Sequence, residues 1–136
     1  MTIPAGTDIQ AQADHWAGVA RGVAPLVAAA GERTEKERKV PADVMKALHE
    51  AKLFRLLMPR SINGCEADPL SYMQVLEEIS AADASTGWCL GQGLGCSLAA
   101  AFVDRAVAAE IYDKPDGVLA WGPPNGAKAI KAKGGY

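Results

Sequence analysis

Three side chains that could line a substrate pocket recur at every fourth position of the sequence. Trp88, Gln92 and Cys96 are spaced i, i+4 and i+8, so on an α-helix they share one face. A ring, an amide and a thiol on one face can contact an apolar ligand, with the Gln92 amide orienting it through a hydrogen bond. The same spacing is typical of a helix face that packs against another helix. The sequence leaves both interpretations open.

The other reactive residue types form no catalytic or metal-binding pattern. Cys65, Cys89 and Cys96 contain no C-x-x-C pair, and His15 and His49 stand far apart, so no zinc or other metal site is expected. No His or Lys lies close to Cys89 in sequence to activate it, and we expect a small buried side chain there. His49 is expected to face solvent. No catalytic residue is predicted.

The composition is that of a globular domain. The 136 residues are 49% apolar and 22% charged, with a net charge of −2. Because nucleic-acid binders usually carry a basic excess on one face, no nucleic-acid partner is expected. Unpaired cysteines fit a reducing compartment, and the first ten residues lack the basic start and apolar run of a signal peptide. We therefore expect a cytoplasmic protein.

One uncharged stretch, Ala84–Val103, is long enough to be tested as a membrane span. Its flanks are Asp83 and Asp104 rather than lysine or arginine, and its glycines and hydroxyls keep its hydrophobicity low. We expect a buried core helix and no membrane association. Three of its glycines recur at every fourth position and predict a smooth strip that another backbone can approach closely. They are Gly87, Gly91 and Gly95.

Apolar periodicity, prolines and aspartates divide the chain into about five helices. The first, Ile9–Glu37, is one long helix or a kinked pair, because Pro25 should bend or restart it. The others begin near Val40-Pro41, at Pro69, after Asp83 and after Asp104. Thr7 or Asp8 can cap the first helix, and Asp68, Asp83 and Asp104 can cap the last three.

The segments between and after these helices are expected to be extended or turn-rich. Leu53–Pro59 runs apolar into a proline and predicts an extended segment. Val118–Trp121 and Ala127–Lys133 are expected to form strands, followed by a hairpin turn at Gly134-Gly135. The predicted fold is mainly α: an up-and-down domain of about five helices over residues 1–117. The first one or two strands of an incomplete β-domain follow over residues 118–136.

Three segments in this order resemble the acyl-CoA dehydrogenase superfamily. Val40–Gly91 is similar to that family's amino-terminal helical domain, from the helix before "LFRLLMP" to "ADASTGW". Phe102–Tyr112 resembles the short helix that precedes its middle β-domain, and Leu119–Tyr136 resembles the opening of that β-domain. The "STGW" run and the Pro-Pro-x-Gly-x-Ala loop look closest to the flavin-dependent monooxygenase branch.

The resemblance implies a flavin cofactor, FAD or FMN, in the complete family member. It also implies hydroxylation of aromatic or polycyclic substrates with reduced flavin from a separate flavin reductase, or alternatively acyl-CoA dehydrogenation. By resemblance, the loop that begins at Trp121 would approach the flavin through backbone groups. An ordinary turn is the other interpretation of this loop. The cofactor-binding candidates are Trp121, Gly122, Gly126 and Ala127.

The family's other regions, which hold the flavin and the catalytic carboxylate, have no counterpart in these residues. We therefore expect this chain alone to bind flavin weakly or not at all, because flavin sites enclose most of the ligand surface. The exposed helical faces are expected to drive homo-oligomerisation. The alternative function is a non-catalytic helical interaction or oligomerisation module.

Overall fold

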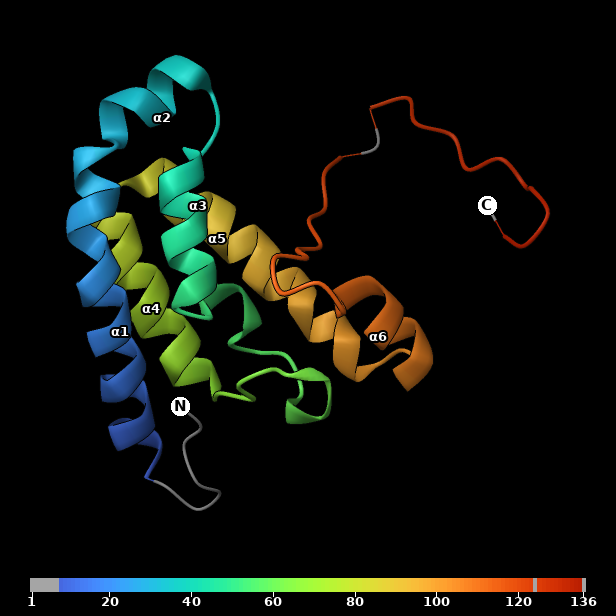
Figure 1. Cartoon of the computed structure of the whole chain (residues 1–136), viewed down its shortest axis with the longest axis horizontal. Coiled ribbons are helices and arrows are strands. Elements are labelled where there is room, and N and C mark those ends of the chain that lie inside the picture. The colour runs from blue at the N-terminus through green and yellow to red at the C-terminus, as the bar shows by residue number, and fades with distance from the viewer. Residues whose placement is uncertain (1–7, 124, 136) are drawn as a thin grey trace.

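The computed structural model describes residues 8–123 and 125–135, and it is mainly helical. These residues form six α-helices and three short 3₁₀ turns (Figure 1). The α-helices are α1 (Ile9–Ala29), α2 (Gly31–Glu37), α3 (Ala42–Glu50), α4 (Pro69–Ala82), α5 (Ala84–Ser97) and α6 (Arg105–Tyr112). The 3₁₀ turns are η1 (Leu53–Arg55), η2 (Arg60–Ile62) and η3 (Leu98–Ala101). The predicted mainly α fold is confirmed.

Four of the helices alternate in direction along the chain, as the up-and-down prediction requires. In Figure 1, α1 and α4 run in one direction, while α3 and α5 run in the other. Two polar contacts fix the parallel pair α1 and α4: Asp68 N donates to Gln12 Oε1 at 3.0 Å, and Arg21 pairs with Glu78 at 2.8 Å. α4 then packs against α5, and α5 packs against η1.

One apolar core joins these elements, because each helix contributes one stripe of buried side chains. The buried members are Trp16, Ala20, Val27, Ala30, Val44, Leu48, Leu53, Phe54, Leu56, Val75, Ile79, Leu90 and Leu94. A smaller cluster under α6 contains Met58, Ala100, Ala108 and Tyr112. The second cluster connects α6 to the segment after η1, so α6 is an attached part of the helical domain.

Aspartate side chains cap the helices as the sequence predicts. Asp68 accepts a hydrogen bond from Ser71 N at 3.0 Å, Asp83 from Thr86 N at 2.6 Å and Asp104 from Ala106 N at 2.8 Å. Asp8 caps α1 by accepting from Gln10 N at 3.1 Å, and Thr7 lies outside the described residues. Each cap satisfies an amide that has no partner within its helix.

The first helical segment is a kinked pair, but the break does not occur at Pro25. α1 continues through Pro25 to Ala29, and α2 turns away from it at Ala30 (Figure 1). Ala30 N is shared between the carbonyl oxygens of Leu26 and Val27 at 3.2 and 3.1 Å. Such a shared hydrogen bond is common at helix ends. The chain therefore tolerates the proline inside α1 and breaks one turn later.

Three extended segments predicted from the sequence are wrong. Leu53–Arg55 is a 3₁₀ turn, because a compact turn buries four successive side chains: Leu53, Phe54 and Leu56 enter the core, and Arg55 reaches the segment after α6. Val118–Trp121 and the described residues of Ala127–Lys133 form no strand. Ala132 and Gly135 form one isolated antiparallel bridge, which confirms a tight turn at that point. A strand whose backbone groups have no neighbouring strand is not stable in water.

Within residues 8–123 and 125–135, no helix combines the length and apolar content that crossing a bilayer requires. The uncharged stretch after Asp83 forms α5, which ends after 14 residues at Ser97, and continues into η3. Leu90 and Leu94 of α5 are fully buried in the core. The buried-helix interpretation of this stretch is confirmed for that face of α5.

Candidate functional site

α5 carries the three candidate pocket residues on the face opposite its buried leucines. Trp88 is 69% exposed, whereas Gln92 and Cys96 are partly buried. Asp83 starts the helix at a fixed residue, and burial of Leu90 and Leu94 sets its rotation, so these three side chains must point away from the core. The structure thus brings them together on one face. Their role in binding stays a prediction.

The four cofactor-binding candidates lie in an exposed segment after α6. Trp121 is 66% exposed, and a Cβ atom built on Gly122 or Gly126 meets nothing within 4 Å. Gly126 has a φ of +87°, a backbone conformation that glycine adopts without strain. Figure 1 shows this segment running away from the helices. The described structure therefore does not bring the loop and the α5 face together, and its flavin role stays a prediction.

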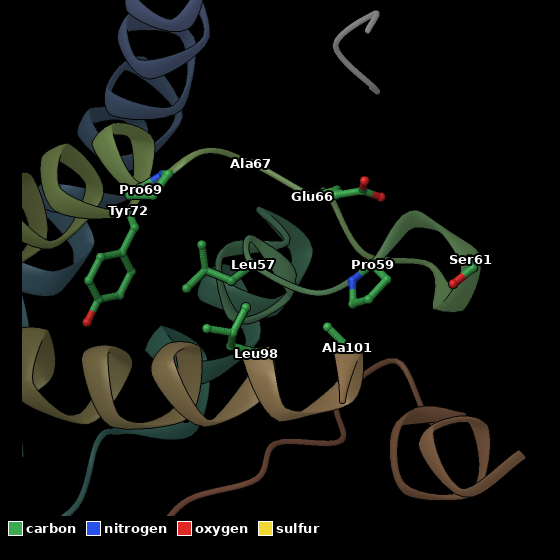
Figure 2. A pocket seen from close by; sticks show the side chains of 9 residues that line it. All are labelled: Leu57, Pro59, Ser61, Glu66, Ala67, Pro69, Tyr72, Leu98 and Ala101. Carbon is green, nitrogen blue, oxygen red and sulfur yellow. The ribbon is translucent and has the colours of Figure 1, made fainter. Parts of the chain in front are cut away.

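An apolar groove of about 690 Å³ lies between α4, η3 and the loop that follows η1. Figure 2 shows Tyr72, Leu57 and Leu98 converging at one end, with Pro59 and Ala101 beyond them. The full lining is Leu57, Pro59, Ser61, Glu66, Ala67, Pro69, Tyr72, Leu98 and Ala101. This groove was not predicted from the sequence, because it forms only where three distant segments meet.

The groove is suited to binding rather than to acid–base chemistry. Its walls are mostly apolar. The acidic side chain in its lining, Glu66, already accepts a hydrogen bond through Oε2 from Arg60 N at 3.0 Å. Trp88, Gln92 and Cys96 are not among its lining residues. In the described part of the chain, no group of three or more His, Cys, Asp or Glu side chains could hold a metal ion.

The prediction of a buried Cys89 is wrong, and the solvent-facing prediction for His49 holds only in part. Cys89 is exposed, because it lies on the outer face of α5 beside Trp88 rather than with the buried leucines. His49 is partly buried and its ring lies 4.8 Å from that of Phe54. Burial lowers the pKa of the His49 imidazole, since desolvation disfavours its charged form, and the Asp116 carboxylate opposes this only in part. Burial likewise raises the pKa of the Cys65 thiol.

Arg55 is a buried charged residue whose contacts were not predicted from the sequence. It is only 5% exposed, and its guanidinium donates to four backbone carbonyls. The signal was present as a single charge inside the apolar run Leu53–Met58. A buried charge requires partners, so its position in that run could have prompted a search for them.

The sequence of this chain is similar to those of known proteins. The family described as acyl-CoA dehydrogenase, N-terminal domain, matches residues 10–113. An indole-3-acetate monooxygenase of Pseudomonas putida is 33% identical over 105 residues, which is 75% of this chain and 26% of that protein. The oxygenase component of a FADH(2)-dependent resorcinol hydroxylase of Rhizobium is 33% identical over 122 residues, 88% of this chain and 29% of that protein.

A third relative has the highest identity of these three, over a shorter stretch. The oxygenase subunit HsaA of a flavin-dependent monooxygenase of Rhodococcus jostii is 41% identical over 64 residues, 47% of this chain and 17% of that protein. The chain thus spans less than a third of the length of each of these relatives. The family match covers α1 to α6, whose order and caps are those described above. By fold and by sequence, the chain belongs to the acyl-CoA dehydrogenase N-terminal domain family, alongside flavin-dependent monooxygenases.

Proposed function

We propose that this chain is the amino-terminal helical part of a flavin-dependent monooxygenase, in the oxygenase component that hydroxylates an aromatic or polycyclic substrate. The observation that carries the proposal is the family match over residues 10–113, together with relatives that are named as monooxygenases or hydroxylases. Reduced flavin, as FAD or FMN, comes from a separate flavin reductase. The name "oxygenase component" of one relative supports this division of labour.

In this proposal the outer face of α5 forms one wall of the substrate pocket. The exposure of Trp88 supports it, because an aromatic ring that no helix of the domain covers is available to stack on an aromatic substrate. Gln92, one turn further along α5, orients the substrate through its amide, and Cys96 continues the wall. The Trp121–Ala127 loop would contact the flavin through backbone groups.

The described residues do not by themselves enclose a flavin. The loop residues are exposed, and the segment that carries them runs away from the α5 face (Figure 1). Since ligand sites of this class bury most of the ligand surface, one open wall gives little affinity. We therefore expect the purified 136-residue chain, equilibrated with FAD or FMN and then desalted, to retain no stoichiometric flavin absorbance. Co-elution of one flavin per chain would contradict this expectation.

A chimeric enzyme tests the proposed function directly. The Rhizobium resorcinol hydroxylase component would receive this chain in place of the 122 residues that match it, and would be supplied with FADH2. We expect flavin binding and measurable hydroxylation, and we expect Trp88→Ala in the chimera to lower the hydroxylation rate. The unmodified hydroxylase is the control. A soluble, helical chimera that binds flavin but hydroxylates nothing would contradict the proposal.

The alternative function, a helical oligomerisation module, is supported by apolar side chains on α6 and on the link between η3 and α6. Phe102 is 83% exposed, and Val103, Val107 and Ile111 follow at a spacing of four residues with 42 to 46% exposure. Such a stripe favours self-association. We expect light scattering at micromolar concentration to give a mass above that of one 14.2 kDa chain, and Val107→Lys to reduce it. A monodisperse monomer before substitution would exclude this alternative.

A further inference from the structure

Arg55 connects two parts of the chain that are far apart in sequence. It belongs to η1, next to the core residue Phe54, and its guanidinium reaches the turn that follows α6. Its Nη2 donates to Tyr112 O at 2.8 Å and to Lys114 O at 2.7 Å, and its Nε donates to Pro115 O at 3.3 Å. Its Nη1 donates to Ile62 O at 3.3 Å. Three of the four acceptors therefore lie in one short segment, Tyr112–Pro115.

These carbonyls are suited to a guanidinium. α6 ends at Tyr112, so the carbonyls at and beyond its end have no amide partner within the helix. The Tyr112 carbonyl also lies at the negative end of the α6 dipole, which attracts a cation. A guanidinium presents five N–H groups in a fixed planar fork, whereas an ammonium group presents three donors from a single point. Arginine can therefore bind several carbonyls of a curved segment at once.

A second contact holds the same segment three residues later. Val118 lies against Gly93 of α5: a Cβ atom at Gly93 would stand 2.6 Å from Val118 Cγ1 and 3.0 Å from the Phe54 ring. Such distances leave no room for a side chain at Gly93. Between this contact and Arg55, Gly117 N donates to Lys114 O at 3.0 Å and closes the turn. The chain is thus held from Tyr112 to Val118 before the Trp121–Ala127 loop begins.

We propose that Arg55 is a positioning residue: by binding the Tyr112, Lys114 and Pro115 carbonyls it fixes where the chain leaves the helical domain, and so directs the Trp121–Ala127 loop. The value of this placement for flavin contact rests on the proposed function. The anchoring of residues 112–115 does not, because the hydrogen bonds that make it lie within the helical domain. Arg55 touches no substrate or cofactor in this role.

Amide hydrogen exchange on the complete 136-residue chain tests the proposal without flavin. In Arg55→Lys, we expect exchange at Gly117 and in the last turn of α6 to rise about tenfold or more, because several charge-assisted hydrogen bonds are lost. Exchange in the middle of α1 and α4 should stay unchanged. Arg55→Gln, which keeps a planar donor but no charge, should loosen the same segment.

Two controls separate a local role from general instability. Arg21→Lys changes an exposed arginine on α1, which pairs with Glu78, and should leave residues 112–118 as protected as in the parent chain. Gly87→Ala strains the α4–α5 contact and should not act selectively on that segment. The proposal is overturned if Arg55→Lys leaves Gly117 exchange unchanged, raises exchange equally in α1 and α4, or unfolds the chain. A failed chimera would leave this result intact and count against the proposed function alone.

Discussion

Replacing Gly87 by alanine is expected to lower the free energy of unfolding by about 2 kcal/mol, the usual cost of overpacking a tight contact. A Cβ atom at Gly87 would overlap the Ser80 hydroxyl and stand 2.8 Å from Ser80 Cα and 2.9 Å from Ser80 Cβ. Because two of these atoms belong to or adjoin the α4 backbone, no rotamer change can relieve the overlap. α4 and α5 would have to move apart and weaken the core between them.

Gly95→Ala, on the same helix, is the matched control. A Cβ atom there meets nothing within 4 Å, so the only effect is the higher helix propensity of alanine. That gain should raise the free energy of unfolding by about 0.5–1 kcal/mol. Urea denaturation followed by circular dichroism measures both variants against the parent chain. If Gly87→Ala were as stable as Gly95→Ala, the close approach of α4 and α5 at Ser80 would be incorrect.

The glycine spacing predicted a strip that another backbone can approach closely, but it could not tell which of these glycines lie in close contact with the neighbouring helix. α4 and α5 are joined through Asp83 alone, so they are closest near that junction and diverge beyond it (Figure 1). Gly87 is therefore in tight contact, and a Cβ at Gly91 would meet a Leu76 methyl at an ordinary 3.4 Å. Gly95 faces open space. The crossing of two helices is a property of the whole packing, not of local spacing.

Features decided by local chemistry were predictable. The caps at Asp68, Asp83 and Asp104 depend on a side chain and an amide two or three residues away, and all three are formed. Leu53–Arg55 was not predictable in this way. A short apolar run can be extended or compact, and burial against α5 decides in favour of the turn.

The candidate site shows the same limit. Periodicity correctly put Trp88 and Gln92 on one face of α5, because that follows from helix geometry alone. It could not say whether that face is covered, since coverage depends on which elements pack beside α5. The Arg55 contacts and the groove beside Tyr72 were missed for a related reason: their partners lie as much as 60 residues away in sequence.

Leu90→Ala should be the other large effect, with a loss of about 3 kcal/mol in the free energy of unfolding from lost burial and the cavity left behind. Leu90 is 0% exposed and belongs to the core shared by α1, α4 and α5. Trp88→Ala removes a larger side chain from the same helix. Because that ring is 69% exposed, we expect a change of only about 0.5 kcal/mol or less. Urea denaturation of both variants provides the comparison.

The contrast between these two variants bears on function as well as on packing. Truncating a large aromatic ring without loss of stability means that the folded domain does not need it, which leaves contact with another molecule as its use.

Denaturation at two chain concentrations distinguishes the possible molecules. If Trp88→Ala is destabilising only at high concentration, a second copy covers the ring, because association stabilises the folded state by mass action. If it is neutral at both concentrations yet lowers hydroxylation in the chimera, Trp88 acts on the substrate side. A loss of about 3 kcal/mol at every concentration, equal to that of Leu90→Ala, would mean that Trp88 is a core residue and that α5 has no free face.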